Sequence, residues 1–367
     1  MNESHSVSEE FYRESQAPQL FVSDTVYWDS RAFEFRAQAS HQHYVEVFLS
    51  KCKLRPGDVV FDMGCGAGSL AIPLLEAGHS VIAADFSPAM LDLLYSDMKK
   101  RGLSVCSPAE AQYMLQGKGS RGFRDLVSKP SVSTSDDNLG GSSRVVSNNN
   151  ANPFSNSDAL IRASFNNGQP ITCFPIRLAW DDDWRAVGLR ENMVDVAIAS
   201  RSWATQNYQR ATTNLSCLAK RRVCVTVADQ IFPDVNQEVM EEIGLVCPRP
   251  YESDRVMGAV SAEGYHLQSE PIVLTRTESF ESVQQAWEKY KLMVEKIASI
   301  QRCTHQEIQS AQVNLKEWLR VHLVEATQSN LEPQENAQTS RSESGKKYII
   351  DTPRIHRWAC ISWDTTK

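Results

Sequence analysis

The segment FDMGCGAGSLA, residues 61–71, places Gly64, Gly66 and Gly68 within five positions. It directly follows the apolar residues Val59 and Val60, so a buried strand is expected to run into a glycine-rich turn. Glycine packs no side chain and loses more backbone entropy on folding than other residues. Three glycines at the end of a strand therefore indicate that something approaches the backbone closely at this point.

Strand-like and helix-like stretches alternate on either side of this segment. A helix ending at Gly78, a second strand ending in Asp85 and a helix with Pro88 in its first turn are expected after it. Further strands are expected at 171–180, 193–203, 221–229 and 265–276, with a helix at 208–219. Strands separated by helices predict an α/β fold with a parallel sheet and crossover helices.

Composition divides the remainder of the chain. Residues 1–50 are expected to form an N-terminal helical cap, and residues 104–170 a low-complexity insertion. The insertion is rich in Ser, Asn, Gly and Asp and has little apolar surface to bury, so it is expected to be largely disordered, with a short helix near 108–116.

The C-terminal third carries three further segments. Residues 279–327 predict a pair of amphipathic helices, 328–346 a polar linker, and 347–367 the final strand of the sheet. Residues 51–103 and 171–278 together are expected to form the ligand-binding domain.

Parallel α/β sheets bind ligands at the carboxyl ends of their strands, which is where this glycine loop lies. The dinucleotide pattern needs a third glycine at position 69, which is Ser69, and no Lys follows to make a phosphate-binding P-loop. Instead, Asp62 precedes G-x-G-x-G. This form suits S-adenosylmethionine, whose methionine end is a zwitterion without phosphate. The carboxylate of Asp62 suits the ammonium, and backbone amides of the loop suit the carboxylate.

Two other strand ends carry acids. Asp85 is expected at a distance where it accepts both ribose hydroxyls, and the run Asp181–Asp183 is expected to receive the adenine amine.

The motif D-x-G-x-G-x-G, together with VIAADFSPAML and DVAIASRS, resembles the class I S-adenosylmethionine-dependent methyltransferases. More narrowly, the chain is similar to a bacterial branch with recurring short signatures. These lie at Tyr27–Asp29 with Arg31 and Ala32, Trp180–Trp184, Ile198–Ser202 and Arg357–Trp363. The resemblance covers about 21–103 and 171–363 and leaves out the insertion.

The resemblance implies a Rossmann-like seven-stranded sheet in the order 3-2-1-4-5-7-6, with the seventh strand antiparallel, helices on both faces and the extra helical pair before the last strand. The implied cofactor contacts are Asp62, Gly64, Cys65, Gly66 and Gly68 for the methionine end, Asp85 for the ribose, Phe86, Asp181 and Asp182 for the adenine, and Ser200 near the methyl group. Arg201 would face the methyl group and the substrate with Ser200. Many nitrogen methyltransferases carry Asn/Asp-Pro-Pro-aromatic at that place, whereas this chain has Ser200-Arg201-Ser202-Trp203, which argues against an adenine acceptor.

Composition limits the partners. The net charge of −7 disfavours nucleic acid, and no apolar stretch reaches the roughly 20 residues of a membrane span. The nine cysteines form no CxxC pair or metal-like cluster, so a reducing, cytoplasmic location without a bound metal is expected. His41 and His43 are candidates for a general base, but the pattern assigns no catalytic residue.

The sequence thus predicts methyl transfer to an unidentified acceptor, most simply a small molecule. The alternatives are an RNA or protein acceptor, aminopropyl transfer on the same scaffold, and a non-catalytic binding or assembly module.

Overall fold

The computed structural model describes residues 29, 42–116, 165–166, 169–229, 235–247, 252–327 and 347–366. The chain divides into two compact units. The main unit comprises Ser23–Thr226, Val256–Ser269 and Ile361–Lys367, and the helical unit comprises Met1–Val22, Val227–Arg255 and Glu270–Cys360. Among the described residues, no helix is long and apolar enough to cross a membrane.

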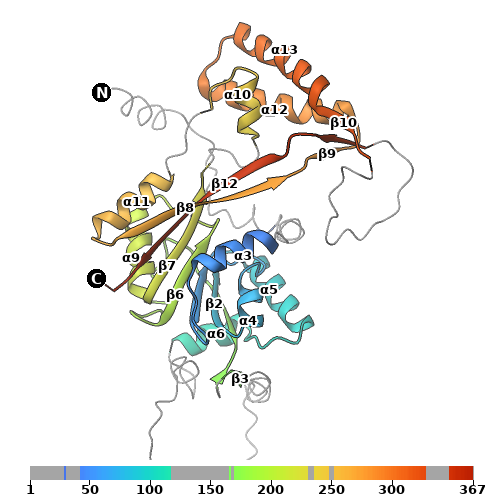
Figure 1. The fold of residues 1–367 in the computed structure, drawn as a ribbon. Helices are drawn as coiled ribbons and strands as arrows, with labels where there is room; N and C mark the ends of the chain where they lie inside the picture. Colours follow the sequence, from blue (N-terminus) through green and yellow to red (C-terminus); the bar gives the residue numbers. More distant parts are fainter. Residues whose placement is uncertain are drawn as a thin grey trace, which may run out of the picture. The chain divides into compact units, whose positions relative to one another are not determined.

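A seven-stranded sheet organises the chain (Figure 1). Its spatial order is β5 (Cys173–Arg177), β2 (Ser80–Asp85), β1 (Val59–Met63), β6 (Val194–Ser200), β7 (Ala219–Ala228), β12 (Arg354–Asp364) and β8 (Leu267–Arg276). Numbered along the chain, these strands run 3-2-1-4-5-7-6, so the predicted strand order is confirmed. The last three strands carry residues of both units.

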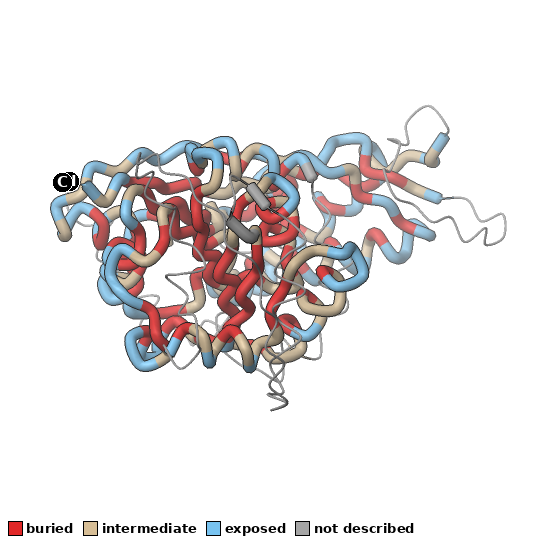
Figure 2. Tube along the Cα trace, turned by 90° about the horizontal axis from the view of Figure 1, so that it is seen from below, coloured by how far each residue is buried: buried red, intermediate tan, exposed pale blue. Residues whose placement is uncertain are grey.

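The strands pair in the directions that the sequence predicted. β5, β2, β1, β6 and β7 form parallel pairs. Hydrogen bonds link Asp229 to Arg357 and Thr365 to Arg221, so β12 runs antiparallel to β7. Every residue of β1 is buried, as expected for a strand covered on both faces, and Figure 2 shows buried residues concentrated in the strands.

Side chains cap two of the longer helices of the main unit. α5 (Pro88–Lys100) is capped by Ser87 and has Pro at its first position, and α9 (Tyr208–Leu218) is capped by Asn207. α4 (Ala71–Glu76) contacts β2, α5 contacts β2 and β5, and α9 contacts β6. α3 (Gln42–Lys51) is the described helix of the predicted N-terminal cap, the rest of which lies outside the described residues apart from Asp29.

The first residues of the predicted insertion belong to the main unit. α6 (Pro108–Leu115) begins at a capping box formed by Ser107 and Glu110 and packs on β5, where Val105 also bridges to Cys173. A short hairpin, β3 (Phe165–Asn166) and β4 (Gln169–Pro170), precedes β5. The short helix expected near 108–116 is thus present, and it packs on the sheet. Residues 117–164, on which the prediction of disorder mainly falls, lie outside the described residues.

The predicted helical pair is present in the helical unit. It consists of α12 (Val283–Gln301) and α13 (His305–His322), which pack with α10 (Gln237–Glu242) around Tyr290 and Trp318. A small antiparallel sheet joins them, in the order β10 (Leu323–Glu325), β11 (Tyr348–Ile350) and β9 (Ser279–Phe280). The sequence analysis did not predict α10, α11 (Glu252–Ala262) or this sheet.

A buried carboxylate anchors the helical unit. Glu278 accepts hydrogen bonds from Tyr290 Oη at 2.6 Å, Lys289 Nζ at 2.5 Å and Arg354 Nη1 at 3.3 Å. Burial acts to raise the pKa of Glu278, but these hydrogen bonds and positive charges outweigh it and lower the pKa. The carboxylate is therefore stabilised in its charged form.

We expect Glu278→Gln to reduce the free energy of unfolding at pH 7 by about 1–3 kcal/mol, because charge-assisted hydrogen bonds to Arg354 and Lys289 are weakened. A lowered pKa stabilises the fold above the ordinary carboxyl pKa, so the difference should shrink as the pH falls below about 4. Urea unfolding at several pH values measures it. Glu295→Gln, in the exposed pair with Lys291, is the control and should change little; equal effects of the two variants would contradict the assignment.

Candidate active site

The glycine loop between β1 and α4 contains glycines of two kinds. All three have positive φ, at +74° for Gly64, +53° for Gly66 and +94° for Gly68. A Cβ on Gly64 would lie 2.2 Å from Ser202 Cβ, and one on Gly68 would lie 2.3 Å from Leu94 Cδ1. A Cβ on Gly66 would meet nothing within 4 Å. Close contacts within the protein therefore require glycine at positions 64 and 68, whereas the space that a Cβ on Gly66 would occupy is open.

Hydrogen bonds fasten the loop to the end of β2. The amides of Gly64 and Cys65 donate to Ala84 O at 2.7 and 3.0 Å, and the amide of Gly66 donates to Asp85 Oδ2 at 2.8 Å. Cys65 is buried, and burial raises the pKa of its thiol well above the ordinary value. Its side chain is therefore a packed, protonated thiol beneath the loop.

Asp85 ends β2 with its carboxylate directed at backbone donors. Besides the Gly66 amide, it accepts from the Ser87 amide at 2.9 Å. Burial raises its pKa, and the backbone hydrogen bonds only partly offset the effect. Nearby Asp29 adds to the rise, and this residue accepts a hydrogen bond from Ser87 Oγ. Asp85 thus holds both the glycine loop and the residue before α5 through hydrogen bonds from their backbone amides.

Asp62, the last but one residue of β1, is a buried acid at the start of the loop. It is 1% exposed, and its Oδ2 is buried with no hydrogen-bond partner. Burial and, secondarily, the charge of Asp85 raise its pKa to about 7. A buried carboxyl oxygen without a partner costs free energy unless a ligand completes it, so this atom identifies the loop as a candidate binding site.

The segment after β6 meets the same loop. Ser202 Oγ donates to Met63 O at 2.5 Å, and Trp180 Nε1 donates to Ser202 O at 2.7 Å. Ser200 Oγ is 2.7 Å from the hydroxyl of Tyr44, which is also 2.7 Å from Thr226 Oγ1. The ends of β1, β2 and β6 therefore converge, as the prediction for a parallel sheet requires.

The residues proposed to contact adenine have local hydrogen bonds. Asp181 Oδ1 accepts from Thr205 Oγ1 at 2.9 Å, and Asp182 Oδ2 accepts from the Ala179 amide at 2.8 Å. Both side chains are exposed, and Phe86, next to Asp85, is half-buried. A role for these residues at the adenine remains a prediction.

Sequence reasoning missed three residues of this region. Tyr44 and Thr226 join α3 to the ends of β6 and β7 through hydroxyls, for which the apolar periodicity gave no signal. Asp29 belongs to the Tyr27–Asp29 signature but was assigned no role. Of the two candidate bases, His43 is exposed on α3 and His41 lies outside the described residues. The described ranges contain no cluster of three or more metal-ligating side chains.

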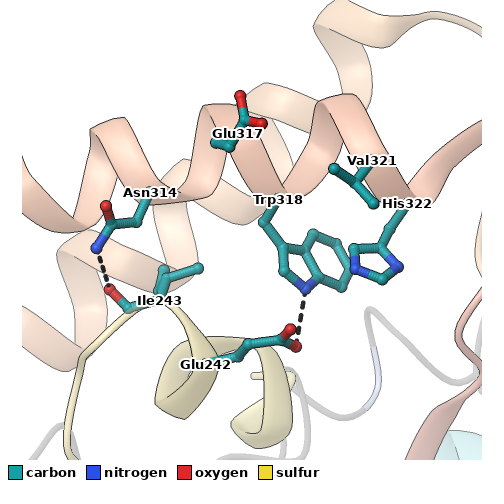
Figure 3. A pocket seen from close by; sticks show the side chains of 7 residues that line it. All are labelled: Glu242, Ile243, Asn314, Glu317, Trp318, Val321 and His322. Atoms are coloured by element: carbon teal, nitrogen blue, oxygen red, sulfur yellow. Dashed lines mark hydrogen bonds between the residues drawn. The ribbon is translucent and has the colours of Figure 1, made fainter.

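A separate groove of about 260 Å³ lies on the helical unit (Figure 3). Its polar walls are paired with each other, since Trp318 Nε1 donates to Glu242 Oε2 at 2.9 Å and Asn314 Nδ2 donates to Ile243 O at 3.0 Å. None of the predicted site residues lines it. We therefore regard it as the packing junction of α10 and α13.

Comparison with known proteins supports the resemblance at the glycine loop. Residues 60–116 match the family described as Methyltransferase domain. The resemblance to methyltransferases is thereby confirmed for the segment that runs from β1 to α6. An uncharacterized protein of Haemophilus influenzae is 33% identical over 78 residues, which span 21% of this chain and 29% of that protein.

Two solved structures are similar over longer ranges. A putative methyltransferase from Bacillus halodurans has a TM-score of 0.40 at 9% identity, covering 88% of this chain and 99% of that one. Magnesium protoporphyrin IX methyltransferase from Synechocystis, solved with bound SAH, has a TM-score of 0.37 at 14% identity, covering 68% and 90%. The assignment of the fold rests on the strand order described above.

The raised pKa of Asp62 predicts that the free energy of unfolding depends on pH. The folded pKa of about 7 lies above the ordinary value, so the folded chain holds an extra proton between about pH 4 and 7, and stability falls as the pH rises through that window. Asp62→Asn mimics the protonated acid. We expect the variant to exceed wild type in unfolding free energy at pH 8 by on the order of a few kcal/mol, with the gap closing near pH 4.

Urea unfolding of ligand-free protein at both pH values measures this gap. Asp92→Asn, at an exposed carboxyl of α5, is the matched control and should follow wild type. A gap between Asp62→Asn and wild type that does not change with pH would show that Asp62 is ionised in the folded chain.

Proposed function

We propose that this protein is an S-adenosylmethionine-dependent methyltransferase acting on a small-molecule acceptor. The observation that carries the proposal is that one loop at the carboxyl edge of the sheet holds both an unpartnered, buried Asp62 Oδ2 and a glycine, Gly66, with open space at the place of a Cβ. A carboxyl oxygen and a bare backbone in one loop suit a ligand that brings an ammonium group close to the main chain.

The residues around the loop fit the parts of this cofactor. Asp62 would accept the ammonium, and Asp85 has lone pairs beyond those used by the Gly66 and Ser87 amides with which to accept ribose hydroxyls. Phe86, Asp181 and Asp182 are the proposed adenine contacts, and Ser200 is proposed to lie near the methyl group. Asp29 adds a third acid, and such a negative environment favours a ligand that carries a sulfonium and an ammonium.

When bound, S-adenosylmethionine supplies an electrophilic methyl group on a sulfonium. The chain's own contribution is then orientation and exclusion of water, which a buried strand end and a loop fixed by hydrogen bonds provide. No catalytic base is assigned, because the choice among the carboxylates of the site depends on which proton the acceptor would lose.

Two further features support the choice of acceptor and compartment. The net charge of −7 disfavours a polyanionic acceptor such as RNA. None of the nine cysteines forms a disulfide, which suits a reducing compartment and supports a cytoplasmic location. The second candidate function, a non-catalytic module that binds the same cofactor, would show binding without transfer of labelled methyl groups to any fraction of a cell extract.

The test of cofactor binding uses Gly66→Ala. A methyl group there would occupy the proposed ligand position, so we expect the affinity for S-adenosylhomocysteine measured by calorimetry to fall at least 10-fold. Gly102→Ala is the matched control, because Gly102 also has positive φ, at +70°, and open space around its Cβ, but follows the far end of α5. Equal affinities of the two folded variants would overturn the assignment of the loop.

Asp62 predicts proton release on binding. A ligand ammonium lowers the pKa of Asp62 from about 7, so binding near pH 6.5 should release part of a proton and should tighten as the pH rises through 7. Calorimetry in two buffers of different ionisation enthalpy measures the release. Asp62→Asn should abolish it, and a wild-type protein that releases no proton would show that another group holds the ammonium.

A further inference from the structure

The glycine loop has few amides left for the anionic end of a methionine-like ligand. The amides of Gly64, Cys65 and Gly66 donate to Ala84 O and Asp85, and the amide of Gly68 donates to Cys65 O at 3.0 Å. The helix that follows, α4, has only six residues. The ligand's carboxylate therefore needs a partner other than these four amides, in a region where Asp62 and Asp85 would repel it.

The segment after β6 brings a cation to the edge of this loop. Ser202 touches the loop directly, through its hydrogen bond to Met63 O and its close approach to Gly64. Arg201 is the residue before it and is half-buried. Its guanidinium is thus carried by the same short segment that closes against the glycines.

The backbone of Arg201 is held in an unusual conformation. Its φ is +55°, a region that costs a residue with a side chain about 1–3 kcal/mol and persists only where the surroundings enforce it. Here the Arg201 amide donates to Thr226 O at 3.1 Å and Thr226 Oγ1 at 3.0 Å. The end of β7 therefore fixes the direction in which the side chain leaves.

The side chain is held as firmly as the backbone. Arg201 Cζ lies over the ring of Tyr44, 4.3 Å from its centroid. Tyr44 is fully buried, stacks on Phe48 and is fixed by its hydroxyl contacts with Ser200 and Thr226. A ring face orients a guanidinium through the attraction between the cation and the negative face of the ring. The side chain is thus oriented by α3, one residue along the chain from the contact of Ser202 with the loop.

We infer that Arg201 receives the carboxylate of the cofactor's methionine end, with Tyr44 and Thr226 as the residues that position it. The inference rests on the proposed function and adds a second charge partner to it. Asp62 would match the ammonium and Arg201 the carboxylate, so the site would recognise both ends of the zwitterion. A planar guanidinium fork suits a carboxylate because it donates two parallel hydrogen bonds.

The experiment compares two ligands that differ in the methionine end. S-adenosylhomocysteine carries the carboxylate and the ammonium, whereas 5′-methylthioadenosine has the same nucleoside and thioether without them. We expect Arg201→Gln to weaken the first by about 10- to 100-fold and to leave the affinity for the second unchanged, as for loss of a hydrogen bond between charged groups. Arg201→Lys should recover part of the loss.

Two controls separate this effect from damage to the fold. Arg101→Gln removes an equal charge at the far end of α5, where Arg101 pairs with Glu76, and should alter neither affinity. The melting temperature of Arg201→Gln without ligand is the second control and should equal that of wild type.

The outcomes distinguish this inference from the proposed function. If Arg201→Gln binds S-adenosylhomocysteine as wild type does, or loses both ligands equally, the carboxylate assignment is overturned while the proposed function stands. If wild type binds neither ligand, both are overturned.

Discussion

The hydrogen bond from the Gly66 amide to the Asp85 carboxylate holds the candidate site together. It joins the loop after β1 to the end of β2 and leaves Gly66 as the one glycine of the three with open space around its missing side chain. It also keeps Asp85 near Asp62, so that two acids share a buried region and the charge of one raises the pKa of the other. Such an arrangement is unfavourable in an empty protein, and a cationic ligand would relieve it.

The site obtains its charges from strand ends. Asp62, Asp85 and Arg201 are contributed by, or directly follow, β1, β2 and β6, which lie side by side in the sheet. β1 is buried along its whole length and β2 and β6 along most of theirs, and the charged groups of the site lie at or just after the carboxyl ends of these strands. The rigid parallel sheet thus sets the spacing of groups of opposite charge, and loops contribute only the final few residues.

The strand order and the approximate position of the site could be predicted from the sequence, because apolar runs, capping residues and the glycine motif are local signals. Asp62 and Asp85 were expected in one ligand site, and the charge of Asp85 does reach Asp62 and raise its pKa. Ser200 was placed in that site only by the resemblance, and its role there stays a prediction. The contacts that could not be predicted join the ends of side chains that lie far apart in the sequence. Tyr44 touches Ser200 and Thr226 through one hydroxyl, while its position on α3 resembles any other apolar position. Periodicity likewise did not show that the loop amides are used within the protein, nor did it find the short elements α10 and β9–β11.

The place of β12 in the sheet has a consequence for biosynthesis. β12 lies between β7 and β8, yet it is made after both of them and after α12 and α13. Until residues 354–364 leave the ribosome, β7 presents an open edge and β8, which pairs with no other strand of the main sheet among the described residues, cannot join it. Completion of the sheet is therefore a late step that requires contacts between distant parts of the chain, the kind of pairing that forms slowly. Loss of this one strand would remove two strands from the finished sheet.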